Sequence, residues 1–237
     1  MLIFLAIFPP LYIIYKIYKL DKYEKEPVKE IIITFILGCL TVIPVFIVSP
    51  IMNKILLIPN NFVDLVGGGL LGDSEVKILI YTFVGIALVE EFFKFIVLTK
   101  YSFKRECFNE PMDGIVYAVI VSMGFAFVEN IIYVYIYSGE SFSVAIMRMF
   151  SAIPAHALMG VIMGHYVGKA KFDPINRKFL FIKGLFGAVV LHGLYNYFLF
   201  SELGIGLLSL ISLIVSYRIA KKIIKEGQEN SPFKLNN

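Results

Sequence analysis

Residues 78–99 read ILIYTFVGIALVEEFFKFIVLT, a long apolar run in which only Glu90, Glu91 and Lys94 are charged. As an α-helix, a run of this length measures about 30 Å, the thickness of the hydrocarbon core of a bilayer. Lipid offers no hydrogen-bond partners, so the backbone N–H and C=O groups must pair with each other, as they do within a helix. The sequence therefore predicts an all-α, polytopic bundle of about seven transmembrane helices, whose other members are 2–20, 31–50, 113–137, 143–168, 179–200 and 203–220.

The composition supports lipid as the main solvent of this chain. Hydrophobic residues make up 58% of the 237 residues and charged residues only 17%, with a mean hydropathy of +0.79. A soluble core does not need so much apolar sequence. The two cysteines, Cys39 and Cys107, lie in different segments without ligand-like spacing, so neither a disulfide framework nor a cysteine zinc site is expected.

The basic residues predict the orientation of the bundle. Most of the 22 Lys and Arg residues fall in four clusters, at 16–29, 100–105, 169–178 and 218–234, which are alternate connections between the apolar runs. The positive-inside rule then places the N-terminus outside and the C-terminus in the cytoplasm, as in a multi-pass protein of the cell membrane. The clusters are topological markers and do not indicate a nucleic-acid partner.

Within this scheme residues 1–237 form a single integral membrane domain. Residues 51–77 are expected to form an extracytoplasmic loop, because they contain proline, asparagine and a run of glycines. The polar residues 226–237 are expected to form a disordered cytoplasmic tail. Residues 78–200 carry the ionisable groups inside the spans and are expected to form a catalytic core of four helices.

The ionisable residues inside the spans are informative because each costs roughly 2.5 to 3.5 kcal/mol on insertion scales and must be paired or face a cavity. Around an ideal helix, Lys94 lies about 40° from Glu90 and about 60° from Glu91. Its ammonium is therefore expected between the two carboxylates, so that one stays ionised while the other holds a proton. The other polar residues of this group are Glu129, Asn130, Arg148, His156, His192 and Asn196.

Four of these residues are predicted to lie in one layer. Counted from the outer end of each span, Glu90 lies about 18 Å deep, Glu129 about 12 Å, His156 about 20 Å and His192 about 12 Å. Such a layer can activate water, since a carboxylate accepts its proton, an acid returns one to the leaving amine, and N–H groups stabilise the oxyanion. His165 is expected on the opposite face of its helix from His156, near the interface.

The residues alone leave structural roles open. Glu129 and Asn130 could form an interhelical hydrogen-bonding pair. Arg148 could snorkel to the interface or pair with a carboxylate such as Glu129.

Other functions are open as well. Zinc held by His156, His192 and one glutamate would make a metal-dependent membrane protease, although no H-E-x-x-H pair is present and the Lys94 ammonium opposes a divalent cation. A transporter or proton-relay protein would also use buried Glu and His, but no internal repeat is found. A receptor or immunity protein without catalysis is a further alternative.

Four short motifs follow one another on successive spans within about residues 78–200. They are Glu90-Glu91-x-x-Lys94, Phe125-x-x-x-Glu129-Asn130, His156-x-x-x-Gly160 and His192-x-x-x-Asn196. In this order they resemble the PrsW family of glutamate-type intramembrane proteases, which are relatives of the CAAX prenyl endopeptidases and of bacteriocin-processing proteins.

The resemblance implies a protease without a cofactor. It would make the first, site-1, cut in a membrane-anchored anti-sigma factor on its extracytoplasmic side, as part of a stress response. Glu90 and Glu91 then look like the catalytic carboxylates. His156 and His192 look like acid/base or oxyanion partners, and Asn196 looks like an oxyanion donor.

The second motif departs from the CAAX branch, where it ends in histidine. Here it ends in Glu129, which argues against a prenyl-protein substrate. The resemblance leaves Glu129 either catalytic or positioning Arg148 or a histidine. Lys94, Phe125, Asn130 and Arg148 are expected to support the site.

Overall fold

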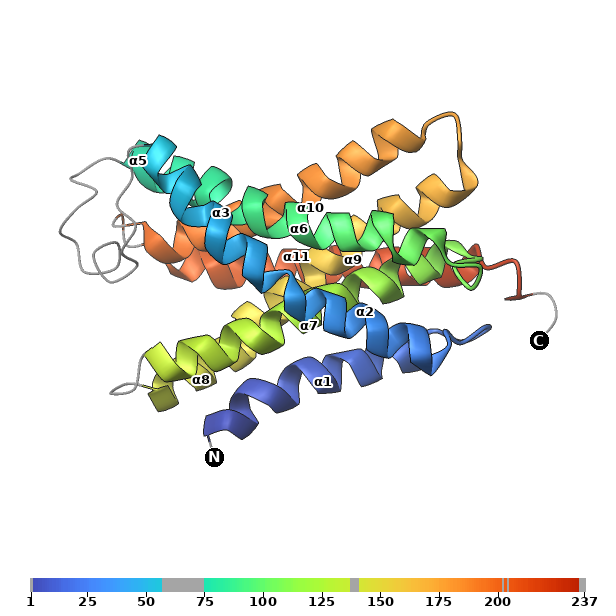
Figure 1. Ribbon diagram of the computed structural model, residues 1–237, viewed down its shortest axis with the longest axis horizontal. Coiled ribbons are helices and arrows are strands. Elements are labelled where there is room, and N and C mark those ends of the chain that lie inside the picture. Colours follow the sequence, from blue (N-terminus) through green and yellow to red (C-terminus); the bar gives the residue numbers. More distant parts are fainter. Residues whose placement is uncertain (1, 57–74, 137–140, 202, 204, 235–237) are drawn as a thin grey trace.

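The computed structural model describes residues 2–56, 75–136, 141–201, 203 and 205–234 (Figure 1). Over these residues the regular structure is helical, and the predicted all-α class is confirmed. The elements are α1 Leu2–Leu20, α2 Val28–Leu40, α3 Val42–Ile55, α5 Glu75–Ile80, the π-helix η1 Tyr81–Leu88, α6 Val89–Lys100, the 3₁₀-helix η2 Ser102–Lys104, α7 Pro111–Ile136, α8 Ser141–Phe150, α9 Ala152–Phe172, α10 Arg177–Phe200 and α11 Leu207–Glu229.

Several helices are long and apolar enough to cross a membrane. In the described part of the chain five segments meet this criterion, namely Leu2–Leu20, Val28–Ile55, Pro111–Tyr135, Phe142–Phe172 and Arg177–Phe200. The other two predicted spans, 78–99 and 203–220, are also helical, as α5–η1–α6 and α11. Taken over their whole lengths, α5–η1–α6 and α11 carry more charged residues than any of the five, because α6 holds Glu90, Glu91 and Lys94 and α11 becomes basic toward its end. The chain is a multi-pass membrane protein.

Helix α7 forms the centre of the bundle. It packs against α9, α2 and α1. Of the residues in its most apolar stretch 72% are buried, against 17% of those in α1. Glycines allow the close approaches: a Cβ on Gly124 would lie 2.9 Å from the Cys39 backbone nitrogen of α2, and one on Gly160 of α9 would lie 3.0 Å from the Ala118 carbonyl oxygen of α7. Side chains larger than glycine would push these helices apart.

Two predicted spans are interrupted. The predicted run 31–50 falls on α2 and α3, which meet at Thr41, where the hydroxyl donates to the Gly38 carbonyl at 2.6 Å. The predicted single helix 143–168 is divided into α8 and α9 at Ser151, whose hydroxyl donates to the Met147 carbonyl at 2.7 Å. A hydroxyl that bonds to a backbone carbonyl of the preceding turn competes with the backbone hydrogen bonds of the helix. Near Ser151, Pro154 also lacks a backbone N–H, which removes one further hydrogen-bond donor.

The prediction that residues 226–237 are disordered is wrong for residues 226–229. Helix α11 continues to Glu229, and Lys169 Nζ lies 2.7 Å from Glu226 Oε1. The Gln228 amide also donates to the Leu20 carbonyl. Polar composition predicts disorder only where no partner is near, and here α9 and α1 supply partners. Residues 235–237, and 57–74 of the predicted loop 51–77, lie outside the described residues, whereas residues 51–55 belong to α3.

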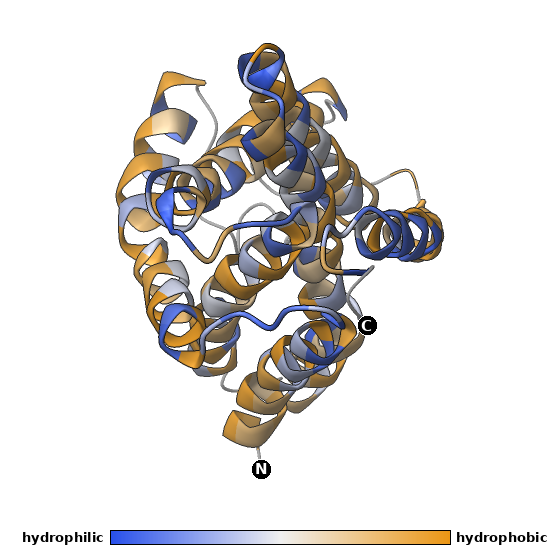
Figure 2. Cartoon of the chain, turned by 90° about the vertical axis from the view of Figure 1, so that its right-hand side faces the viewer, coloured by the Kyte–Doolittle hydropathy of each residue, from blue (hydrophilic) through white to orange (hydrophobic). Residues whose placement is uncertain are grey.

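The connections rich in basic residues lie at one end of the bundle. In Figure 1 the segments 21–27, 101–110 and 173–176 and the C-terminus are at the right, and the N-terminus is at the left. Figure 2 looks onto that right-hand end, where hydrophilic segments gather while the outer faces of the helices are hydrophobic. This arrangement agrees with the alternation used to predict the orientation, which itself stays a prediction.

Cysteine labelling tests the orientation. In a variant whose two native cysteines are replaced by alanine, Arg105→Cys and Asn176→Cys should react with a membrane-impermeant maleimide only after permeabilisation. Ser201→Cys, at the opposite end, should react in intact cells. Labelling of Arg105→Cys from outside would reverse the assigned orientation.

Candidate active site

Four predicted site residues meet inside the bundle. Glu90 and Glu91 come from α6, His156 from α9 and His192 from α10, and one donor atom of each lies within 4.8 Å of all the others. All four side chains are buried. Only the two glutamates share a helix turn, so tertiary packing brings these four residues, the quartet, together.

The ammonium of Lys94 lies among the members of the quartet. Its Nζ is 2.8 Å from Glu91 Oε1, 3.6 Å from Glu90 Oε2 and 3.2 Å from His156 Nδ1. The predicted position between the two carboxylates is therefore confirmed. The Phe125 ring covers the ammonium at 4.2 Å and provides a cation–π contact, which gives this residue of the second motif a physical role.

The contacts of His192 assign its tautomer. Its Nδ1 lies 2.9 Å from Glu91 Oε1, an oxygen that already accepts a hydrogen bond from Lys94. Because a carboxylate oxygen accepts, Nδ1 carries the proton and Nε2 carries the lone pair. Nε2 lies 3.9 Å from Glu90 Oε2, which is buried without a hydrogen-bond partner in the described part of the chain. Two acceptors cannot bond to each other, and at this separation one water can donate to both of them.

A second set of contacts extends this network toward α8. Glu129 Oε2 lies 2.7 Å from Arg148 Nη2 and 3.0 Å from His156 Nε2. Since Lys94 can only donate, His156 Nδ1 accepts from it and the Nε2–H donates to Glu129. Arg148 Nε donates to Asn130 Oδ1 at 2.6 Å. Arg148 therefore pairs with Glu129 and does not snorkel.

Two predicted residues lie outside the quartet. Asn196 is buried one turn beyond His192 on α10, but over the described residues its amide makes no recorded hydrogen bond to the quartet. His165 lies apart from the other histidines, with Lys169 and Glu226 as its charged neighbours.

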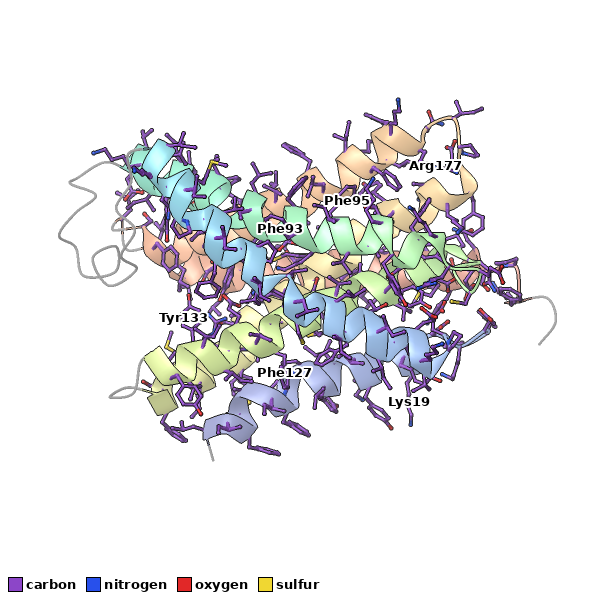
Figure 3. All side chains as sticks on the ribbon, viewed as in Figure 1. Lys19, Phe93, Phe95, Phe127, Tyr133 and Arg177 are labelled. Atoms are coloured by element: carbon purple, nitrogen blue, oxygen red, sulfur yellow. The ribbon has the colours of Figure 1, made fainter. Side chains whose placement is uncertain are left out.

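Sequence reasoning missed Tyr133 and the π-helix η1. The Arg148 guanidinium lies 3.8 Å from the centre of the ring of Tyr133, a residue of α7 that is labelled in Figure 3. The spacing of Tyr133 four residues after Glu129 was the available signal. Element η1 ends at Leu88, two residues before Glu90, and π-helical turns are frequent at functional sites. Its Phe83 ring fills the space beside Gly193, where a Cβ would lie 2.6 Å away.

The comparison with protein families decides what kind of protein holds this site. The family model described as PrsW family intramembrane metalloprotease matches residues 26–220. The chain belongs to the PrsW family. The resemblance inferred from the four motifs is confirmed, and the chain is an intramembrane protease by membership of this family.

Curated relatives of this PrsW chain agree in name and length. Protease PrsW of Oceanobacillus iheyensis is 34% identical over 95% of this chain and 95% of its own. Protease PrsW of Clostridioides difficile is 32% identical over 90% and 85%, and that of Bacillus subtilis is 34% identical over 77% and 75%. The comparison with solved structures found no match.

The pairing of Arg148 with Glu129 predicts a coupling that stability can measure. Arg148→Met should lower the melting temperature in detergent, because it leaves Glu129 without its cationic partner, a loss of about 3 kcal/mol in buried pairs. Adding Glu129→Gln should recover most of that loss. Additive losses in the double variant would contradict a direct pair.

Proposed function

We propose that this PrsW-family protease hydrolyses a peptide bond with a water molecule activated by glutamate. The observation that carries the proposal is the central position of Lys94, which engages Glu91 and leaves Glu90 Oε2 facing His192 Nε2 across 3.9 Å. A water bridging these two acceptors would donate one O–H to Glu90 and the other to His192. Its oxygen lone pair is then free to attack a carbonyl carbon.

The proposed steps balance as follows. Glu90 takes a proton from the water while the water oxygen bonds to the carbonyl carbon, and the carbonyl oxygen becomes an oxyanion. The proton held by Glu90 then passes to the amide nitrogen, and the C–N bond breaks to give an acid and an amine. Asn196, one turn beyond His192, is proposed as the oxyanion donor from α10.

The remaining residues hold these groups in place. Glu91 accepts from both Lys94 and the Nδ1–H of His192, so it fixes the imidazole with its lone pair toward the water. His156 donates to Glu129, and Arg148 also donates to Glu129, so these two contacts fix the orientation of the His156 ring. We therefore assign Glu90 as the base, Glu91 and Glu129 as positioning residues, and Asn130 and Phe125 as support.

A zinc-dependent reaction is the second candidate, favoured by the description of the family as metalloproteases. The donor set fits the metal: two imidazoles and two carboxylates lie within 4.8 Å, and Glu90 Oε2 and Glu91 Oε2 are buried without hydrogen-bond partners among the described residues. Glu90, Glu91, His156 and His192 would hold the ion. Zinc would supply a Lewis acid and lower the pKa of a bound water. The Lys94 ammonium between these donors favours the metal-free reaction, because it would repel a divalent cation.

For the substrate, we propose a membrane-anchored, single-span protein such as an anti-sigma factor, which receives its first, site-1, cut on the extracytoplasmic side. The family resemblance implies this choice, and the predicted topology puts the quartet near the middle of the bilayer, where a transmembrane segment of the substrate would reach it. A peptide-hydrolysing role also fits the names of the relatives better than a transporter or proton relay does.

Metal removal separates the two reactions. Cleavage of a reconstituted single-span substrate should survive strong chelators, and the purified protein should contain no stoichiometric zinc. Lys94→Met should lose activity, because the proposed network depends on the ammonium. Loss of wild-type cleavage on chelation, restored by zinc, or a Lys94→Met protein that binds zinc more tightly and still cleaves, would establish the metal reaction instead.

The roles within the quartet predict a contrast among variants. Glu90→Gln, Glu91→Gln and His192→Ala should each reduce turnover by about 10²-fold or more, because each removes the base or its alignment. Expression and membrane insertion of the two glutamate variants should change little, since Glu→Gln is nearly isosteric and the other glutamate remains beside Lys94 as its ionic partner. The measurement is the rate of substrate cleavage at matched protein levels.

His165→Gln is the matched control, because it changes a buried histidine of the same helix as His156 away from the quartet. It should cleave at nearly the wild-type rate. Near-normal cleavage by both glutamate variants would exclude the glutamate mechanism.

A further inference from the structure

A second group of acidic side chains lies at the other end of α7 from the catalytic network. Asp21 follows α1, Glu110 precedes α7 and Asp113 lies in its first turn, and all three are buried. Glu26 is also buried, and Glu24 is half-buried. Asp113 is sixteen residues from Glu129 along α7, or about 24 Å, so these carboxylates take no part in the proposed chemistry.

The oxygens of this acidic group are close enough to share one ion. One oxygen each from Asp21, Glu110 and Asp113 lie within 4.8 Å of one another, and the same holds for Glu24, Glu26 and Asp113. Two ligands at about 2.4 Å from a calcium ion are at most about 4.8 Å apart. Both triads meet this limit, and Asp113 belongs to both.

Hydrogen bonds orient the acidic group but leave oxygens free. Asp113 Oδ2 accepts from the backbone N–H groups of Asn109 at 2.7 Å and Glu110 at 2.8 Å, and Glu26 Oε2 accepts from the Tyr117 hydroxyl. In the described part of the chain, six of the other carboxylate oxygens are buried without a hydrogen-bond partner. These are both Oδ atoms of Asp21, Oε2 of Glu24, Oε1 of Glu26, Oε2 of Glu110 and Oδ1 of Asp113.

Unpartnered carboxylate oxygens of fully buried residues are costly unless something binds them. Asp21 is 0% exposed, and neither of its oxygens has a donor. This is an observation separate from the clustering of the acids, and it points to a bound ligand.

Nearby cations do not neutralise the acidic group. Lys25 Nζ donates to the backbone carbonyls of Tyr18 and Asp21, and Lys171 Nζ donates to the carbonyl of Phe103. The ion pairs formed by described residues involve other carboxylates. A divalent cation among these carboxylates would relieve their mutual repulsion.

We propose that Asp21, Glu110 and Asp113, with Glu24 and Glu26 beside them, bind a hard divalent cation, Mg²⁺ or Ca²⁺. Oxygen ligands without histidine or thiolate suit these two ions and not zinc. The ion joins the connection after α1 to the start of α7, the helix that presents Phe125 and Glu129 to the quartet. Its role is therefore to stabilise the bundle, independently of the proposed catalytic mechanism.

Binding is tested on the purified full-length protein in detergent after removal of metals with a chelator. Titration with CaCl₂ and with MgCl₂, followed by calorimetry and by thermal unfolding, should show saturable binding and a rising melting temperature for at least one ion. Comparison of the two titrations identifies the ion. Asp21→Asn should weaken binding by about tenfold or more. Glu91→Gln, in the quartet, should bind the ion as the wild type does.

The sign of the stability change distinguishes a cation site from a merely structural cluster. In chelator, Asp21→Asn should melt at or above the wild-type temperature, because it removes an uncompensated buried charge. With the ion present the order should reverse. Glu229→Gln, at an exposed glutamate of α11, is the control and should follow the wild type in both conditions.

Two results would overturn the site. One is a wild-type protein that shows no saturable binding and no change of melting temperature at millimolar Ca²⁺ and Mg²⁺. The other is an Asp21→Asn protein that binds and responds to the ions as the wild type does. If Asp21→Asn fails to fold, the direct titration of the wild type and the half-buried Glu24→Gln variant, which should bind more weakly, decide the question.

Discussion

The ion pair of Lys94 with Glu91, at 2.8 Å, is the interaction on which the site depends. Carboxylates inside an apolar bundle are tolerated only when they are paired, and a lysine one turn further on the same helix supplies the partner without help from the rest of the fold. Once Lys94 has engaged Glu91, the other charged contacts of the layer follow from the groups that remain. Phe125 and His156 complete the surroundings of the ammonium.

The network that starts at Lys94 also orders the helices around it. It runs through His156 to Glu129 and Arg148 on one side and through Glu91 to His192 on the other. Five helices, α6 to α10, thereby contribute to one buried polar layer. Each contact fixes the orientation of the next group, so the pair of acceptors Glu90 Oε2 and His192 Nε2 is positioned by the whole layer and by no single helix.

Helix α7 connects the two polar regions of the molecule. Its first turn carries Asp113 in the acidic group, and its later turns carry Phe125 and Glu129 in the buried polar layer around Lys94. Between them the helix is packed on several sides against α1, α2 and α9 through apolar and glycine contacts. A rigid, centrally packed helix of this kind suits a site whose chemistry depends on hydrogen-bond geometry.

The sequence by itself determined the all-α membrane class, the segments of most spans, the family and the membership of the polar layer, because hydropathy and i, i+4 spacing are local properties. Only the tertiary structure decided the partners. Whether Arg148 snorkels or pairs depends on how α8 and α7 are rotated about their axes. The tautomer of His192 follows from Glu91, a residue of another helix. The meeting of Asp21 with Asp113, and the ordering of α11 through Glu226 and Lys169, join segments far apart in the chain. Local patterns contain no information on such interhelical distances, which arise only when the helices pack.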